Sequence, residues 1–140
     1  MSAVQEAVKV VRILHGAFLI SIPIYAAVGE FFGPMGAGPG KIIRGALIAV
    51  SLMNVGIAQL FSRRIVTAAE EALARNSSDG TALGRWRQGH LITFVLCESV
   101  ALFGFAFRML GGDLLQAAPL YVLAFALLLV WSPRPEFARQ

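Results

Sequence analysis

Glu98 is the one charged residue inside the apolar run Leu91–Phe107 (LITFVLCESVALFGFAF). A charged carboxylate without a partner is unstable in hydrocarbon, because the charge loses its hydration. The side chain must therefore be neutral, paired with another group, or directed at a polar cavity. Glu98 is thus the leading candidate for a functional side chain.

Polar residues of other apolar segments fall at the depth of Glu98. If each segment is a helix that rises about 1.5 Å per residue, Ser21, Ser51, Asn54 and Tyr121 lie within about 4 Å of the same plane. Asn54 is the best partner for Glu98, because its amide both donates and accepts hydrogen bonds.

Three interpretations of this layer stay open. In the first, a neutral Glu98 joins a hydrogen-bonded cluster that holds the helices together. In the second, Glu98 is a carboxylate that exchanges protons or cations. In the third, Glu98 contacts another subunit.

The two histidines, His15 and His90, form a second candidate site. Each lies near the start of an apolar segment, and histidines from two neighbouring helices can ligate a b-type haem. The alternative is that both bond to backbone, lipid headgroups or water. Apart from this haem no cofactor and no metal is expected, because the single cysteine, Cys97, excludes a disulfide or a multi-cysteine site.

Motifs of soluble enzymes are missing from the sequence. It contains no phosphate-binding loop, no dinucleotide fingerprint and no recognisable pair of nucleophile and base. We therefore expect no enzymatic activity, unless the chain is part of a membrane enzyme complex.

The composition indicates which elements hold these residues. Of the 140 residues 57% are hydrophobic and 14% are charged, whereas soluble domains carry about 25% charged residues. Four apolar stretches approach the roughly 20 residues that cross a bilayer, namely 11–29, 42–61, 89–110 and 114–131. The expected fold is all-α: a single integral membrane domain, a four-helix transmembrane bundle of two antiparallel hairpins.

Turn-forming residues separate these stretches. Residues 31–40 (FFGPMGAGPG) contain four glycines and two prolines, and Gly111-Gly112-Asp113 joins the last two stretches. Residues 62–88 are expected to form a cytoplasmic helical loop. Within it Ile65–Arg75 (IVTAAEEALAR) is rich in helix formers, and either extends the second span or lies along the membrane surface.

Basic residues predict the orientation. With four spans, the termini and the 62–88 loop share one side, which carries nine basic residues against three on the other. The nine are Lys9, Arg12, Arg63, Arg64, Arg75, Arg85, Arg87, Arg134 and Arg139, and the three are Lys41, Arg44 and Arg108. We expect a multi-pass protein of the cell (inner) membrane with both termini cytoplasmic. The net charge of +4 follows from this topology and does not indicate binding to nucleic acid.

The first stretch also has features of a secretory signal peptide. Lys9 and Arg12 precede it, and small residues occur toward its end. Against cleavage, Glu6 lies in the basic region and Pro23 interrupts the apolar run. We therefore count this stretch as the first span.

Two further contacts are predicted between the helices. Glu30 falls at the depth of Arg44 and Arg108, so an ion pair with one of them would join span ends. Small residues line one stripe of the third span (Cys97, Ala101, Gly104) and one of the second (Gly45, Ala49, Gly56). Because small residues allow close approach, these two spans are expected to make the tightest contact.

The segment Ile92–Phe107 resembles the carboxylate helix of ATP synthase c subunits and V-type proteolipids, which carry one acidic residue in mid-membrane. In this comparison Glu98 matches the ion-binding acid and Ser99 an adjacent hydroxyl. Four spans in two hairpins also look like the V-type proteolipid. The resemblance covers these 16 residues, and it implies proton or ion translocation at Glu98.

The expected function is that of a small structural or accessory subunit of a membrane complex, or of a self-associating bundle. Its partners would be the lipid bilayer and either other membrane subunits or further copies of the chain. The alternatives are an ion-coupled unit that uses Glu98, and a haem-binding subunit that uses His15 and His90.

Overall fold

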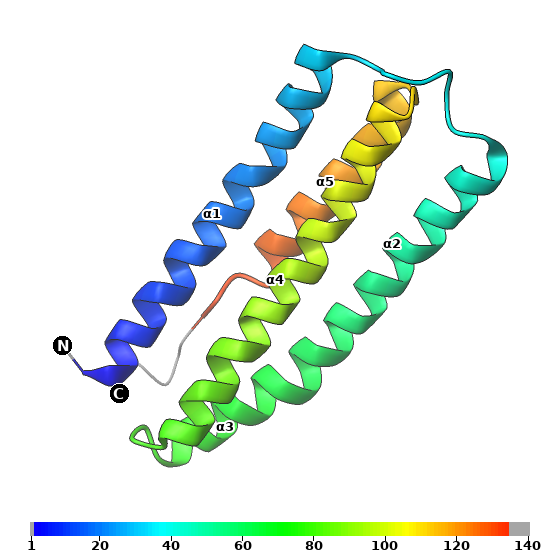
Figure 1. Cartoon of the computed structure of the whole chain (residues 1–140). Helices are drawn as coiled ribbons and strands as arrows, with labels where there is room; N and C mark the ends of the chain where they lie inside the picture. The colour runs from blue at the N-terminus through cyan, green and yellow to red at the C-terminus, as the bar shows by residue number, and fades with distance from the viewer. Residues whose placement is uncertain (1, 135–140) are drawn as a thin grey trace.

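The computed structural model describes residues 2–134, which form a bundle of helices with no strand among them. The elements in order are α1 (Ala3–Phe32), α2 (Lys41–Phe61), the π-helix η1 (Ser62–Val66), α3 (Thr67–Arg75), α4 (Gly80–Met109) and α5 (Leu114–Val130). Because α2, η1 and α3 follow one another without a break, the bundle consists of four rods (Figure 1). The predicted all-α fold is confirmed.

The four rods differ in length. Ala3–Phe32, Lys41–Arg75 and Gly80–Met109 are long and apolar enough to cross a membrane, whereas Leu114–Val130 is apolar but shorter. With a rise of about 1.5 Å per residue, α4 is about 45 Å long and α5 about 26 Å. The N-terminal part of α4 therefore continues beyond the end of α5.

α4 is the central rod. It packs against α1, α2 and α5, while α1 and α2 make almost no contact with each other. In Figure 1, α4 lies between α1 and α2, with α5 behind it. Aromatic and small side chains of α4 fill the core, among them Trp86, Phe94 and Ala101, which are all fully buried.

Polar caps and glycine turns fix where the rods begin and end. Ser2 and Gln5 form a reciprocal capping box at the start of α1, and the Asp79 carboxylate accepts hydrogen bonds from the first amides of α4. At the other end of the bundle, the amide of Gly38 donates to the carbonyl of Leu110 over 3.0 Å. Gly111 (φ 97°) leaves no room for a side chain there, because a Cβ would meet the backbone of residue 36.

The region 62–88 is divided between two rods. Ile65–Arg75 is helical and continues α2 through η1, a turn at 76–79 follows, and the remaining residues are the first turns of α4. The π-helical η1 packs closely on α4 at Gly89, where an added Cβ would come within 2.8 Å of Val66 Cγ2.

The small-residue stripes lie differently from the prediction. Gly104 faces α5 rather than α2, because an added Cβ would meet Leu120 Cβ at 3.1 Å. Gly45 and Gly56 have open space where a Cβ would stand, so the predicted α2 face is wrong. The buried residues of α2 are Ser51 and Ala58. The small face of α4 at Gly104 is covered by α5, through Ala117, Leu120 and Tyr121.

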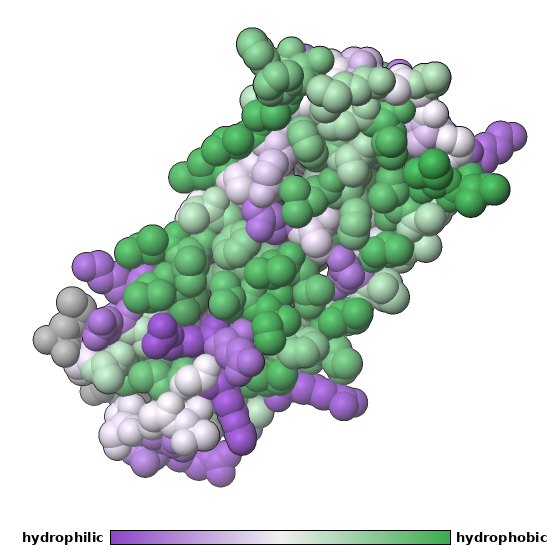
Figure 2. Space-filling view, in the orientation of Figure 1, coloured by the Kyte–Doolittle hydropathy of each residue, from purple (hydrophilic) through white to green (hydrophobic). Residues whose placement is uncertain are grey.

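The outer surface of the bundle is largely apolar. Large hydrophobic side chains are exposed on all four rods, among them Ile20 on α1, Leu52 on α2, Val95 on α4 and Val122 on α5. Figure 2 shows hydrophobic residues over the middle of one face and most of the hydrophilic ones toward the end that holds α3. A surface of this kind is expected where lipid tails, rather than water, surround the helices.

Candidate functional site

Glu98 pairs with a tyrosine of α1. The Tyr25 hydroxyl donates to Glu98 Oε1 over 2.7 Å, and Glu98 is half-buried between α1 and α4. Glu98 Oε2 has no hydrogen-bond partner among residues 2–134. The pair thus satisfies one carboxyl oxygen and leaves the other open to a further donor.

Asn54 bonds to the neighbour of Glu98 instead. Its Nδ2 donates to Ser99 Oγ over 2.6 Å, and Ser99 Oγ in turn donates to the Leu96 carbonyl. Adjacent residues of α4 therefore bond to opposite flanking rods, Glu98 to α1 and Ser99 to α2. These two polar contacts hold α1 and α2 on either side of α4.

The remaining predicted residues of the layer lie in three different settings. Ser21 is one turn before Tyr25 on α1 and donates to the Phe18 carbonyl over 2.8 Å. Ser51 is buried but bonds only within α2, to the Leu47 carbonyl over 2.7 Å. The Tyr121 hydroxyl has no hydrogen-bond partner in the described part of the chain. The layer therefore assembles around Glu98 without Ser51 or Tyr121.

Sequence reasoning missed Tyr25, the actual partner of Glu98. By the rise of the helix its Cα lies about 7 Å from the middle of the first span, beyond the depth of Glu98. Helical side chains, however, lean toward the N-terminus of their helix, which for Tyr25 is toward that middle. The spacing of Ser21 and Tyr25, four residues apart on one helix face, was the available signal.

An open face of α4 separates the two polar contacts. At about 100° per residue, Leu91, Val95 and Leu102 project between the directions of Glu98 and Ser99. Their exposed fractions are 41%, 49% and 41%. We call these three residues, with Glu98 and Ser99 at their edges, the open face. Figure 2 shows small hydrophilic areas within the hydrophobic middle of the side on which α4 lies between α1 and α2.

The two histidines share one aromatic neighbour. The Phe94 ring centroid lies 5.1 Å from that of His15 and 5.6 Å from that of His90. His15 Nε2 donates to the Leu128 carbonyl over 2.7 Å, which satisfies one of the last carbonyls of α5. A haem ligated by both imidazoles would have to break this bond and displace Phe94. The arrangement does not fit that cofactor, and haem binding stays a prediction from the sequence.

The ion pair predicted at the other end is confirmed. Arg108 Nε donates to Glu30 Oε1 over 2.6 Å and its Nη2 to Oε2 over 3.3 Å, so the contact is bidentate. Arg108 also donates to the carbonyl of Gly112. Arg44, the other arginine considered, bonds to Gln116. Arg108 thus ties α1 to α4 and to the turn before α5.

Comparison with known proteins gave no match. No family model, no curated protein and no solved structure is significantly similar to this chain.

Proposed function

We propose that the chain is an integral membrane protein whose four rods cross the bilayer, with both termini and α3 on the cytoplasmic side. Three observations support this: the three long apolar rods, the apolar exposed surface, and the nine-to-three distribution of basic residues. Charged residues gather at the rod ends, where headgroups and water are available.

We further propose that it acts as an accessory subunit that binds a transmembrane helix of another protein on its open face. The observation that carries this is Glu98. A half-buried carboxyl at mid-depth has one oxygen bonded to Tyr25 and the other without a partner among residues 2–134. Lipid tails offer no hydrogen bond, whereas a helix with a polar donor at the same depth would complete the pair.

The open face is accessible to a partner helix. Because α1 and α2 barely touch each other, the exposed apolar side chains of α4 are accessible between them. A partner helix there would contact Val95 and Leu102 and place its polar residue against Glu98. The outward surfaces of α1, α2 and α5 expose apolar residues such as Ile20, Leu52 and Val122, which suits lipid.

Photo-cross-linking tests this proposal in native membranes. A photo-reactive residue in place of Val95 is expected to capture one membrane protein, with the adduct in a transmembrane helix beside a polar residue. The same group in place of Val122, an outward residue of α5 that is 67% exposed, serves as the control. Glu98→Leu is expected to abolish the adduct, whereas Glu98→Gln keeps it, because an amide still forms hydrogen bonds.

Three results would contradict the proposal. Equal capture from both positions would mean unspecific contact, and insensitivity to Glu98→Leu would remove Glu98 from the interface. Capture of a second copy of this chain would show that the open face binds the chain itself in a homo-oligomer and not another protein.

The second candidate function is proton or ion exchange at Glu98. It is favoured by the Tyr25–Glu98 pair, in which a phenol hydroxyl donates to a carboxyl at the edge of the open face. The local resemblance of Ile92–Phe107 to c-subunit helices agrees with it. Proteoliposomes with an enclosed pH dye would show proton flux that Glu98→Gln abolishes and Tyr25→Phe slows. Flux equal to that of empty vesicles would exclude this function for the isolated chain.

A further inference from the structure

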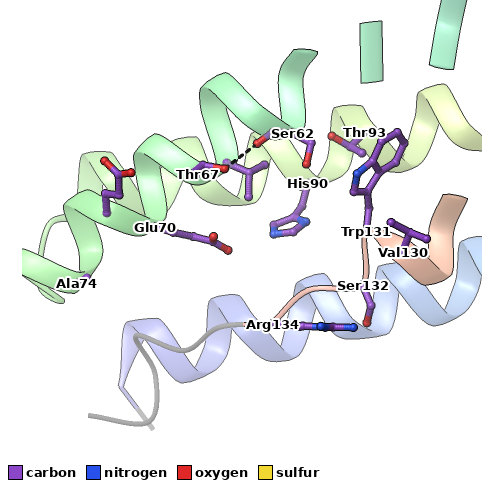
Figure 3. A pocket seen from close by; sticks show the side chains of 12 residues that line it. Ser62, Thr67, Glu70, Ala74, His90, Thr93, Val130, Trp131, Ser132 and Arg134 are labelled. Atoms are coloured by element: carbon purple, nitrogen blue, oxygen red, sulfur yellow. Dashed lines mark hydrogen bonds between the residues drawn. The ribbon is translucent and has the colours of Figure 1, made fainter. Parts of the chain in front are cut away.

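A pocket of about 510 Å³ opens beside His90, at the end of the bundle that holds α3 (Figure 3). It exists because α5 ends at Val130 while α4 continues past it, so that η1 and α3 face residues 130–134 across free space. Its walls include Glu70, Glu71, His90, Trp131 and Arg134. This pocket is separate from the Glu98 layer, and nothing in the proposed docking of a helix uses it.

His90 is the buried polar group of the pocket. The residue is only 6% exposed, and Trp86 packs on its ring with 4.8 Å between the centroids. Its Nε2 has no hydrogen-bond partner in the described part of the chain, and Figure 3 shows the ring directed into the pocket beside Glu70. Since buried polar atoms in proteins are nearly always hydrogen-bonded, we expect a molecule in the pocket to bond to this nitrogen.

The walls carry charges of both signs. Glu70 and Glu71 come from α3, and Trp86 Nε1 donates to Glu70 Oε1 over 3.1 Å, which holds that carboxylate in place. Arg134 lies across the pocket from Glu70 (Figure 3). Trp131 adds an aromatic face, and such faces attract cations. The acidic side of the pocket therefore suits a cationic group and the Arg134 side an anionic one.

The π-helical turn shapes the wall that faces His90. The Thr67 hydroxyl donates to the Ser62 carbonyl over 3.3 Å across η1, and Gly89, the residue before His90, allows Val66 to approach α4 closely. Single π-turns inside α-helices recur at functional sites. Here the turn brings the α3 carboxylates and the buried histidine to the same space.

We propose that this pocket binds a ligand with a primary ammonium group and a nearby phosphate, the chemistry of phosphoethanolamine. The ammonium lies between the α3 carboxylates and donates to His90 Nε2, with the histidine proton on Nδ1. The phosphate pairs with Arg134. The same chemistry occurs as a phospholipid headgroup and as a free metabolite, and Val130, 69% exposed at the rim, offers an apolar surface to an acyl chain.

Native mass spectrometry of delipidated full-length protein in detergent tests the proposal. Phosphatidylethanolamine, phosphatidylcholine, phosphatidylglycerol and soluble phosphoethanolamine are titrated in parallel. We expect phosphatidylethanolamine to bind about tenfold more tightly than the other two lipids, because the choline headgroup has no N–H to donate and the glycerol headgroup has no cation. Displacement by soluble phosphoethanolamine would identify the headgroup alone as sufficient, and binding without displacement would identify the lipid as the source.

Two variants and one control make the assignment specific. Glu71→Gln, at an exposed position, and His90→Phe, which keeps a ring, are each expected to lower the affinity for phosphatidylethanolamine about tenfold. Glu6→Gln removes an exposed carboxylate of α1 outside the pocket and should bind like the wild type. Equal binding of all three lipids, or wild-type affinity in Glu71→Gln, would overturn the proposal even if His90→Phe failed to fold.

Discussion

The Tyr25–Glu98 hydrogen bond shows that the end of a side chain can lie at a different depth in the bundle from its own Cα. Tyr25 has its Cα beyond the Glu98 layer, but its side chain leans back toward the start of α1 and brings the hydroxyl to 2.7 Å from Glu98 Oε1. Ser51 shows the opposite case. It lies at the predicted depth, yet its hydroxyl bonds to the carbonyl one turn earlier in its own helix.

His15 is expected to stabilise the bundle through its bond to α5. His15→Ala would leave the Leu128 carbonyl without its donor in a buried setting, which lowers the free energy of unfolding by about 1–3 kcal/mol. Equilibrium unfolding in detergent micelles, followed by circular dichroism, measures the change. Ile13→Ala, at a position of α1 that is 61% exposed, is the control and should differ little from the wild type. Equal stability of His15→Ala and wild type would show that the bond contributes nothing.

At the scale of elements, apolar runs and turn residues were enough to predict the helices. The predicted stretch 114–131 and the helix Leu114–Val130 differ by a single residue at one end. The helices α1 and α4 begin before the predicted spans, because polar turns such as those containing Lys9 and Arg85 are helical although they are not apolar. Apolar composition predicts which part of a helix can lie in lipid. The start of the helix is determined by its capping residue, Ser2 for α1 and Asp79 for α4.

The choice of neighbours among the helices could not be predicted from small residues alone. A stripe such as Gly45, Ala49 and Gly56 allows close approach without specifying which helix approaches. On α5, the buried residues Ala117, Tyr121, Ala124 and Leu128 recur at helical spacing and match the small face of α4. Side-chain shapes on both helices decide the pairing, and a single sequence shows only each helix separately.

Gly104 and Gly45 give a direct test of that pairing. Gly104→Leu would force a branched side chain into Leu120 and Ala117, and we expect a loss of about 1–3 kcal/mol in unfolding free energy from overpacking. Gly45→Leu places the same side chain in open space and should leave stability unchanged or raised, because leucine favours helix more than glycine does. Thermal unfolding of both variants in one detergent makes the comparison. Equal loss in the two would contradict the α4–α5 contact.

At the scale of the whole molecule, the distribution of basic residues predicts an orientation that labelling can check. Single cysteines at Ser78 and Met35, both exposed, are introduced in a Cys97→Ala background. Met35 is preferable to Gly36, because a Cβ at Gly36 would come within 2.6 Å of the Leu110 carbonyl oxygen. We expect a membrane-impermeant maleimide to label Met35→Cys in intact cells and Ser78→Cys only after the membrane is opened. Labelling of both engineered cysteines in intact cells would contradict the four-span topology.

In the proposed membrane topology, the short α5 also has a consequence for the surrounding bilayer. A hydrocarbon core is about 30 Å thick, whereas the 17 residues of α5 span about 26 Å. Three rods thus match or exceed the membrane thickness and the fourth falls short of it. A bilayer adapts to such hydrophobic mismatch by thinning locally or by drawing headgroups inward. Along the α5 side the lipid surface would dip toward Trp131, and the protein should partition preferentially into thinner membranes.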